Sequence, residues 1–195
     1  MKNRADVINH LIQQNNYNTY LEIGFQYGIS FNAVNCRLKA AIDPNPLAEG
    51  CEFVCTSDEF FEQAIPHAEQ YGRVDSPDII FIDGDHSFEQ SYNDYKNSLQ
   101  ILKPTGAIVF HDTNPYEASQ ATQEPHGGAW CGEVYKTIVA LRLEGVCVYT
   151  YPFDYGVTVV YPHIPAPIPN WEWDANTIDF ATFDKNRKEI LNIVE

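Results

Sequence analysis

Short apolar runs alternate with amphipathic segments along most of the chain. Seven of these runs have the length and apolar character of buried β-strands. The last two are separated by a short turn, which is typical of a hairpin. The predicted strands cover residues 19–23, 40–42, 53–56, 79–82, 107–110, 146–149 and 157–161.

Apolar residues at helical spacing fill the intervals between the predicted strands. The clearest helix begins at Ser87, which has capping-box spacing with Gln90. A stripe of large apolar residues runs along it from Phe88 to Leu102 and is most simply a buried face. Further helices are predicted over residues 6–14, 29–38, 57–65 and 130–141, and a last one contains Ile190, Leu191 and Ile193.

Strands that alternate with helices and end in a hairpin predict an α/β protein. We expect a single Rossmann-like, three-layer α/β/α domain with a mostly parallel, seven-stranded sheet and one antiparallel strand. The length of 195 residues suits one full domain and is too short for two large ones. Residues 1–162 are expected to form this domain. The proline-rich arm and helix of residues 163–195 are expected to pack on it.

The charge balance narrows the possible partners. The net charge is −15, whereas nucleic acids and anionic membranes are bound by clustered Lys and Arg, so neither is an expected partner. The five cysteines form no CxxC pair, which favours reduced thiols in a cytoplasmic protein. The residues after Met1 do not have the pattern of a signal peptide, and no apolar run is long enough to span a bilayer. We therefore expect a cytoplasmic protein that acts on a small molecule.

Acids and histidines directly follow two of the predicted strands. Asp83, Asp85 and His86 come after residues 79–82, and His111 and Asp112 come after residues 107–110. Ligands of open α/β sheets bind outside the carboxyl ends of the strands, so we expect one shared site. A histidine titrates near neutral pH and can take a proton from a hydroxyl, which makes His86 a candidate general base. Its alternative role is a bond to a backbone group at the helix start.

The first predicted strand ends in a turn that contains Gly24 and Gly28. Glycines allow the backbone to approach a ligand closely, and the free amides of a following helix favour a carboxylate or phosphate. Asp43 ends the second strand, where an acid can accept hydrogen bonds from ribose hydroxyls. It can equally form an Asp-Pro turn. Ser57 and Asp58 follow the third strand and suit either an adenine edge or a helix N-cap.

Residues 20–113 resemble class I S-adenosylmethionine-dependent methyltransferases. The similarity is greatest to the catechol and caffeoyl-CoA O-methyltransferases and to small bacterial O-methyltransferases. It is carried by Leu21-Glu22-Ile23-Gly24 through Gly28-x-Ser30, by Asp83-Gly84-Asp85-His86, by Lys103-Pro104-x-Gly106, and by His111-Asp112.

The resemblance implies a site for S-adenosylmethionine. It implies that Glu22 and the amides near Gly24 and Gly28 hold the methionine part of the cofactor, and that Ser30 contacts its carboxylate. Asp43 would hold the ribose, and Ser57 with Asp58 would lie near the adenine. Asp83 would line the same pocket.

The resembling metal-dependent enzymes bind magnesium through an Asp after the fourth strand and an Asp-Asn pair after the fifth. Asp83 and Asp112 match the two acids. Thr113 occupies the place of the asparagine, so its neighbours His111 and Asn114 are the candidates for the third ligand, and His111 is the one we adopt. Oxygen ligands suit Mg²⁺, and a histidine ligand shifts the preference toward Mn²⁺. Alternatively, the two acids only line the cofactor pocket, as in metal-free methyltransferases.

The predicted activity is transfer of a methyl group to a hydroxyl of a small molecule, either a sugar or a phenolic compound. Asp83 and His86 are the predicted catalytic residues, and residues 115–130, including His126 and Trp130, are a candidate cover for the site. Two alternatives stay open: a phosphoesterase-like metal-dependent hydrolase, and a binding protein that keeps the cofactor without turnover. The C-terminal arm allows a homodimer by exchange between subunits.

Overall fold

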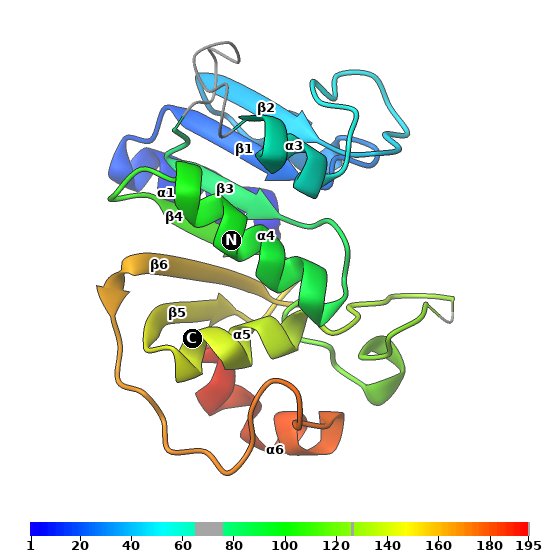
Figure 1. Ribbon diagram of the computed structural model, residues 1–195, viewed down its shortest axis with the longest axis vertical. Helices are drawn as coiled ribbons and strands as arrows, with labels where there is room; N and C mark the ends of the chain where they lie inside the picture. The colour runs from blue at the N-terminus through cyan, green and yellow to red at the C-terminus, as the bar shows by residue number, and fades with distance from the viewer. Residues whose placement is uncertain (65–75, 126, 195) are drawn as a thin grey trace.

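The computed structural model describes residues 1–64, 76–125 and 127–194. Residue 65, at the end of one predicted helix, and His126, in the predicted cover, lie outside these ranges. The described chain forms a sheet with helices on both of its faces (Figure 1). The predicted three-layer α/β/α fold is therefore confirmed.

Six strands form one sheet in the described part of the chain, in the order β2-β1-β3-β4-β6-β5. The first four strands run parallel, and β6 is antiparallel to both of its neighbours. This confirms the predicted mostly parallel sheet with one reversed strand. The strands are β1 (Thr19–Ile23), β2 (Leu38–Ile42), β3 (Ile79–Ile82), β4 (Ala107–Phe110), β5 (Val146–Tyr151) and β6 (Val157–Pro165).

The predicted seventh strand, over residues 53–56, is wrong. Phe53 makes an isolated bridge to Ile42 and two backbone bonds to the end of β2. The side chain of the next residue, Val54, is largely exposed. The hydroxyl of Thr56 accepts a hydrogen bond from the Glu59 amide, while the Glu59 carboxylate accepts from the Thr56 amide. This reciprocal cap turns the chain into a helix before a strand can extend.

The helices are α1 (Arg4–Asn15), α2 (Ile29–Ala33), α3 (Ser57–Ala64), α4 (Phe88–Ile101), α5 (Val134–Leu143) and α6 (Phe180–Leu191). One hydrophobic core joins α1 to one face of the sheet, and a second core joins α3, α4, α5 and α6 to the other face. Figure 1 shows α4 and α5 lying across the same face. Successive residues of each buried strand lie in opposite cores, as the two-residue period of a strand requires.

Two helices are shorter than predicted. Helix α2 ends at Ala33 because the Lys39 ammonium donates to the carbonyls of Phe31 and Val34, which a longer helix would use internally. Helix α5 begins at Val134, not at residue 130, because Gly132 has a φ of +60°. That conformation interrupts a right-handed helix.

The C-terminal segment reaches the sheet through α6. Phe183 is fully buried, and its ring centroid lies 4.5 Å from that of Tyr135 in α5. Arg187 donates to the side chain of Asn114 and to the Pro115 carbonyl, so α6 also holds the chain that follows β4. Among the described residues, we find no helix with the length and apolar character needed to cross a membrane.

Candidate active site

One cavity of about 980 Å³ lies at the carboxyl ends of the parallel strands. It is lined by residues that follow β1, β2, β3 and β4, the edge of the sheet where ligands of this fold class bind. All but one of the predicted site residues line it. The lining set is Glu22, Gly24, Ser30, Asp43, Ser57, Asp58, Asp83, His86, His111 and Asp112.

The exception is Gly28, which does not line the cavity. It caps α2 with a φ of +67°, and a Cβ at this position would lie 2.5 Å from the ring of Phe25. Its role is therefore to let the turn pack on Phe25. Gly24, by contrast, lies at the cavity itself. A Cβ there would lie 2.0 Å from the Asp83 carbonyl oxygen. The loops after β1 and β3 thus touch through a glycine.

Glu22 is a buried acid on β1, 1% exposed, with its carboxylate at the cavity. The hydroxyl of Tyr20, two residues earlier on the same face of the strand, donates a hydrogen bond to it. Burial raises the pKa of Glu22 to about 8, although the Tyr20 hydrogen bond acts in the other direction. A carboxyl group this costly to ionise is a candidate partner for a cationic group of a ligand.

Arg4, from the first turn of α1, joins the methionine end of the predicted site to the acid cluster. Its Nε donates to the Ser30 hydroxyl at 2.7 Å and lies 3.6 Å from Asp83 Oδ2. Its Nη1 contacts Asp154 at 3.2 Å and His111 Nε2 at 3.2 Å. A single cation therefore bridges Ser30 to the acids that follow β3 and β5.

Asp43 forms the local turn that was one of its two predicted roles, and its side chain lines the cavity. Its Oδ1 accepts from the Asn45 amide at 2.7 Å, which is the local turn expected before a proline-containing segment. Its Oδ2 accepts from the Gln26 amide at 2.7 Å, so the acid also ties β2 to the glycine turn after β1. Each carboxylate oxygen has a second lone pair, and the side chain lines the cavity.

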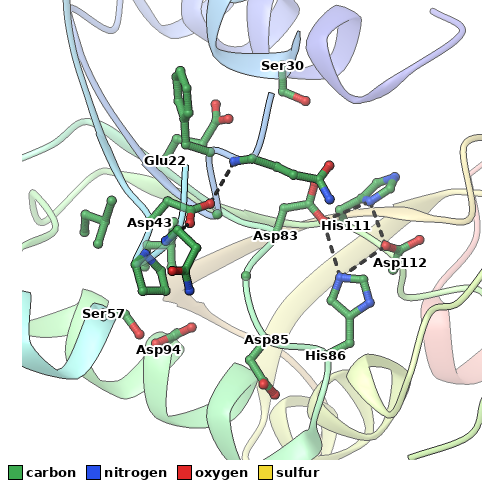
Figure 2. A pocket seen from close by; sticks show the side chains of 18 of the residues that line it. Glu22, Ser30, Asp43, Ser57, Asp83, Asp85, His86, Asp94, His111 and Asp112 are labelled. Carbon is green, nitrogen blue, oxygen red and sulfur yellow. Dashed lines mark hydrogen bonds and ion pairs between the residues drawn. The ribbon is translucent and has the colours of Figure 1, made fainter. Parts of the chain in front are cut away.

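Ser57 and Asp58 open helix α3 and line the far end of the cavity. Gln90 Nε2 donates to the Ser57 hydroxyl at 3.2 Å, to Asp58 at 3.2 Å and to Asp94 at 3.0 Å. The amide of Gln90 is thus shared by three oxygen acceptors from two helices. Figure 2 shows Ser57 and Asp94 beside each other, away from the histidines.

Asp83, His86 and Asp112 form the acid-histidine cluster at the other end (Figure 2). His86 Nε2 lies 3.7 Å from Asp83 Oδ1 and 3.5 Å from Asp112 Oδ2. His86 Nδ1 lies 3.2 Å from the Trp130 carbonyl, which can only accept, so Nδ1 carries the proton and the lone pair of neutral His86 is on Nε2. One ligand atom from each of the three residues lies within 4.8 Å of the others.

His111 is placed differently from the expected metal ligand. Its Nδ1 lies 3.1 Å from Asp83 and 3.0 Å from Asp112, and its Nε2 faces Arg4 and Asp154. Both of its nitrogens are therefore occupied within the protein. Burial acts to lower the pKa of His111, but the charge of Asp83 leads a set of contacts that raise it far above its usual range.

The same contacts shift the pKa values of Asp83 and His86. Burial acts to raise the pKa of Asp83, but the charge and hydrogen bond of His111 outweigh it and hold that pKa well below its usual range. Burial also acts to lower the pKa of His86, and the contacts with Asp83 and Asp112 raise it overall. Asp112 has a φ of +56°, a strained conformation that turns its carboxylate toward the histidines.

The residues after Asp112 point away from the cavity. Thr113 is fully buried and accepts a hydrogen bond from the Thr158 hydroxyl at 2.7 Å. Asn114 bonds Arg187 and the Pro152 carbonyl. Neither lines the cavity, so the Thr113 position that departs from the family pattern is a packing position here.

Part of the predicted cover lies over His86. The Trp130 ring stacks on the imidazole with centroids 4.8 Å apart, and Pro125 and Gly128 also line the cavity. Trp130 Nε1 donates to the Thr122 carbonyl at 2.8 Å, which fixes the ring against the loop. His126 of the same predicted cover lies outside the described residues.

Sequence reasoning missed two cavity residues with strong chemistry, Arg4 and Asp94. Arg4 lies in the opening helix, where a charged side chain is expected to be exposed to solvent. Asp94 lies between Tyr92 and Tyr95 of the apolar stripe in α4. An acid set inside a buried helix face was the available signal for Asp94.

Comparison with known proteins gives one family match. Residues 21–113 match a family model described as a methyltransferase domain. The chain is also 24% identical over 169 residues to the uncharacterized protein y4gI of Sinorhizobium fredii (strain NBRC 101917 / NGR234). That alignment covers 72% of this chain but only 17% of the relative's own length.

Several solved structures share the fold. An O-methyltransferase from Bacillus cereus in complex with SAH has 13% identity and a TM-score of 0.54, with 80% of each chain covered. The SAH-bound methyltransferase PaMTH1 of Podospora anserina has 17% identity and a TM-score of 0.51, covering 80% of this chain and 76% of that one. The O-methyltransferase TomG of Streptomyces achromogenes, in complex with SAM, has 14% identity and a TM-score of 0.50, covering 81% and 78%.

The fold and the matched segment agree with each other. The matched residues run from β1 to the end of β4 and contain most of the cavity-lining acids. The expected resemblance to class I methyltransferases is confirmed: residues 21–113 match the methyltransferase-domain model, and the chain shares the fold of the solved methyltransferases.

Proposed function

We propose that the protein transfers a methyl group from S-adenosylmethionine to a hydroxyl of a small molecule. The observation that carries the proposal is that one cavity is lined by Glu22, Ser30 and Asp43 on one side and by the acid-histidine cluster on the other (Figure 2). The solved relatives in complex with SAH or SAM support the choice of cofactor.

The cofactor fits the cavity group by group. The Ser30 hydroxyl and the Arg4 guanidinium suit its carboxylate, and the buried Glu22 suits its ammonium group. Asp43 has free lone pairs for the ribose hydroxyls. The methyl-bearing sulfonium then lies between these groups and the acids after β3 and β4. The substrate oxygen attacks the methyl carbon as the carbon–sulfur bond breaks, and the enzyme contributes position and charge.

We further propose that Asp83, Asp112 and His86 hold a divalent cation, Mg²⁺ or Mn²⁺. Their ligand atoms converge, both carboxylates face the cavity, and the backbone carbonyl of Trp130 orients His86 so that Nε2 is available. His86 thus replaces His111 as the third ligand in this proposal. A bound cation would lower the pKa of the acceptor hydroxyl. Trp130 supplies an aromatic wall beside the acceptor, which suits a phenolic ring or a sugar.

A hydrolase accounts for less of the structure. A phosphoester site at the acid-histidine cluster leaves Glu22, Ser30 and Asp43 without a role, although they line the same cavity. The cavity is also rich in carboxylates, which repel a phosphate.

The test is transfer of labelled methyl from S-adenosylmethionine to libraries of catechols and sugars, with Mg²⁺, with Mn²⁺ and with a chelator. We expect metal-dependent transfer that falls at least about 10-fold in His86→Ala, since loss of even an outer-shell partner of a metal ligand typically costs about 10–100-fold. The exposed His10→Ala variant is the matched control and keeps full activity.

If a chelator does not affect transfer, the proposed metal is ruled out, and His86 remains as the group that accepts the proton of the hydroxyl. Metal-dependent release of phosphate from phosphoesters, without binding of SAH, would replace the proposal by the hydrolase. Binding of SAH without transfer to any acceptor would favour the silent binding protein. The homodimer stays a prediction, which light scattering of the purified chain tests.

A further inference from the structure

Asp94 in α4 is a buried acid with an unused oxygen at the cavity. The residue is 1% exposed, and its Oδ1 accepts from Gln90 Nε2 at 3.0 Å. Its Oδ2 is buried and has no hydrogen-bond partner among the described residues. Asp94 lines the cavity beside Ser57 (Figure 2). A Cβ on Gly84, another lining residue, would lie 3.8 Å from Oδ2.

An unpartnered carboxylate oxygen is expensive to bury, so the fold alone does not account for it. Burial raises the pKa of Asp94 to about 6, against the opposing effects of the Ser57 hydroxyl and the Gln90 amide. At neutral pH the group is mostly ionised and offers only acceptors.

No donor of the described residues lies within hydrogen-bonding distance of Oδ2. The Gln90 amide is already shared among Ser57, Asp58 and Asp94 Oδ1. Asp58 is a second acceptor at the same end of the cavity. A ligand that completes this end of the cavity therefore brings N–H groups.

We infer that Asp94 Oδ2 accepts a hydrogen bond from the exocyclic amino group of the cofactor's adenine and so determines the choice of base. The inference rests on the proposed function, which puts the adenosyl group in this cavity. With the ribose at Asp43, the base reaches the end lined by Ser57 and Asp94. An amino group brings two donors, whereas a 6-oxo base would set an oxygen against the carboxylate.

The test compares two ligands by calorimetry: SAH and S-inosylhomocysteine, in which an oxygen replaces the amino group. We expect the wild-type protein to prefer SAH by at least about 10-fold, because a hydrogen bond to a charged acceptor is involved. Asp94→Ala and Asp94→Asn should lose most of this preference. Both variants should bind S-inosylhomocysteine at least as tightly as the wild type does, which also shows that they fold. The exposed Glu89→Gln variant of the same helix keeps the wild-type preference.

The other outcomes decide separately on the inference and on the proposed function. An unchanged preference in both Asp94 variants overturns the inference, and so does a preference that disappears in Asp58→Ala but survives in Asp94→Ala. Equal binding of the two ligands by the wild type overturns the inference and leaves the proposed function intact. Binding of neither ligand by the wild type overturns the proposed function itself.

Discussion

Replacing Glu22 by Gln should stabilise the protein without its ligand, by an amount that grows with pH. Burial raises the pKa of this carboxyl from an ordinary value of 4.5 to about 8. The group therefore contributes stability that is fully present below pH 4.5 and is lost as the pH rises toward 8. Glutamine has nearly the shape of the protonated acid and does not titrate.

The size of the effect follows from the same values. One pKa unit corresponds to about 1.4 kcal/mol, so at pH 7, where an unfolded chain has this acid ionised, the native state bears a cost of about 3 kcal/mol. Glu22 is almost fully buried, so solvent screening does not reduce this cost. For a chain of this length, each kcal/mol shifts the melting temperature by about 2–4 °C.

The assay is thermal unfolding of the wild type and Glu22→Gln between pH 4.5 and 9. We expect nearly equal melting temperatures at pH 4.5 and a variant that melts about 6–12 °C higher at pH 7. The exposed Glu52→Gln variant is the control and should follow the wild type. A variant less stable than the wild type at every pH, or a difference that does not change with pH, would show that ionising Glu22 does not destabilise the native state. Under the proposed function, the same variant should bind S-adenosylmethionine more weakly at pH 7, because it has lost the partner of the ammonium group.

Three further substitutions test the geometry. Gly24→Ala should lower the free energy of unfolding by more than about 2 kcal/mol and abolish SAH binding, because its Cβ would lie 2.0 Å from the Asp83 carbonyl. Denaturant unfolding measures the first effect and calorimetry the second. Near-normal values would show that the loops after β1 and β3 do not touch. Trp130→Ala should raise the KM for the acceptor while the affinity for SAH stays within about twofold, and a large loss of SAH affinity would contradict the placement of this ring at the acceptor end. Asp43→Asn should weaken SAH binding by about 10-fold, since it weakens the acceptors for the ribose, and unchanged affinity in calorimetry would count against the ribose site.

Much of the fold could be predicted from the sequence, because the parallel strands are buried on both faces and therefore appear as uninterrupted apolar runs. The same property located the site, since polar residues that directly follow such runs must gather at one edge of the sheet. This is why Asp43, Asp83 and Asp112 were brought together correctly in one cavity, whereas Glu22, which lies inside β1, was assigned to it by the family resemblance. The strand predicted over residues 53–56 failed because a helix cap at Thr56 overrides its apolar pattern.

The remaining features depend on contacts that no local pattern encodes. Arg4 lies 79 positions before Asp83 and reaches it only because α1 packs beside the strand ends. Sequence adjacency to Asp112 favoured His111 as the third ligand. The structure instead groups His86 with the two acids. The Trp130 carbonyl orients the imidazole of His86, whereas Arg4 contacts Nε2 of the His111 imidazole.

The central claim is that the cavity at the strand ends is a site for the adenosyl donor. Calorimetric titration of the wild-type protein with SAH tests it most directly. We expect saturable binding of one SAH per chain, and loss of that binding in Gly24→Ala. Absence of saturable binding up to millimolar SAH would contradict it.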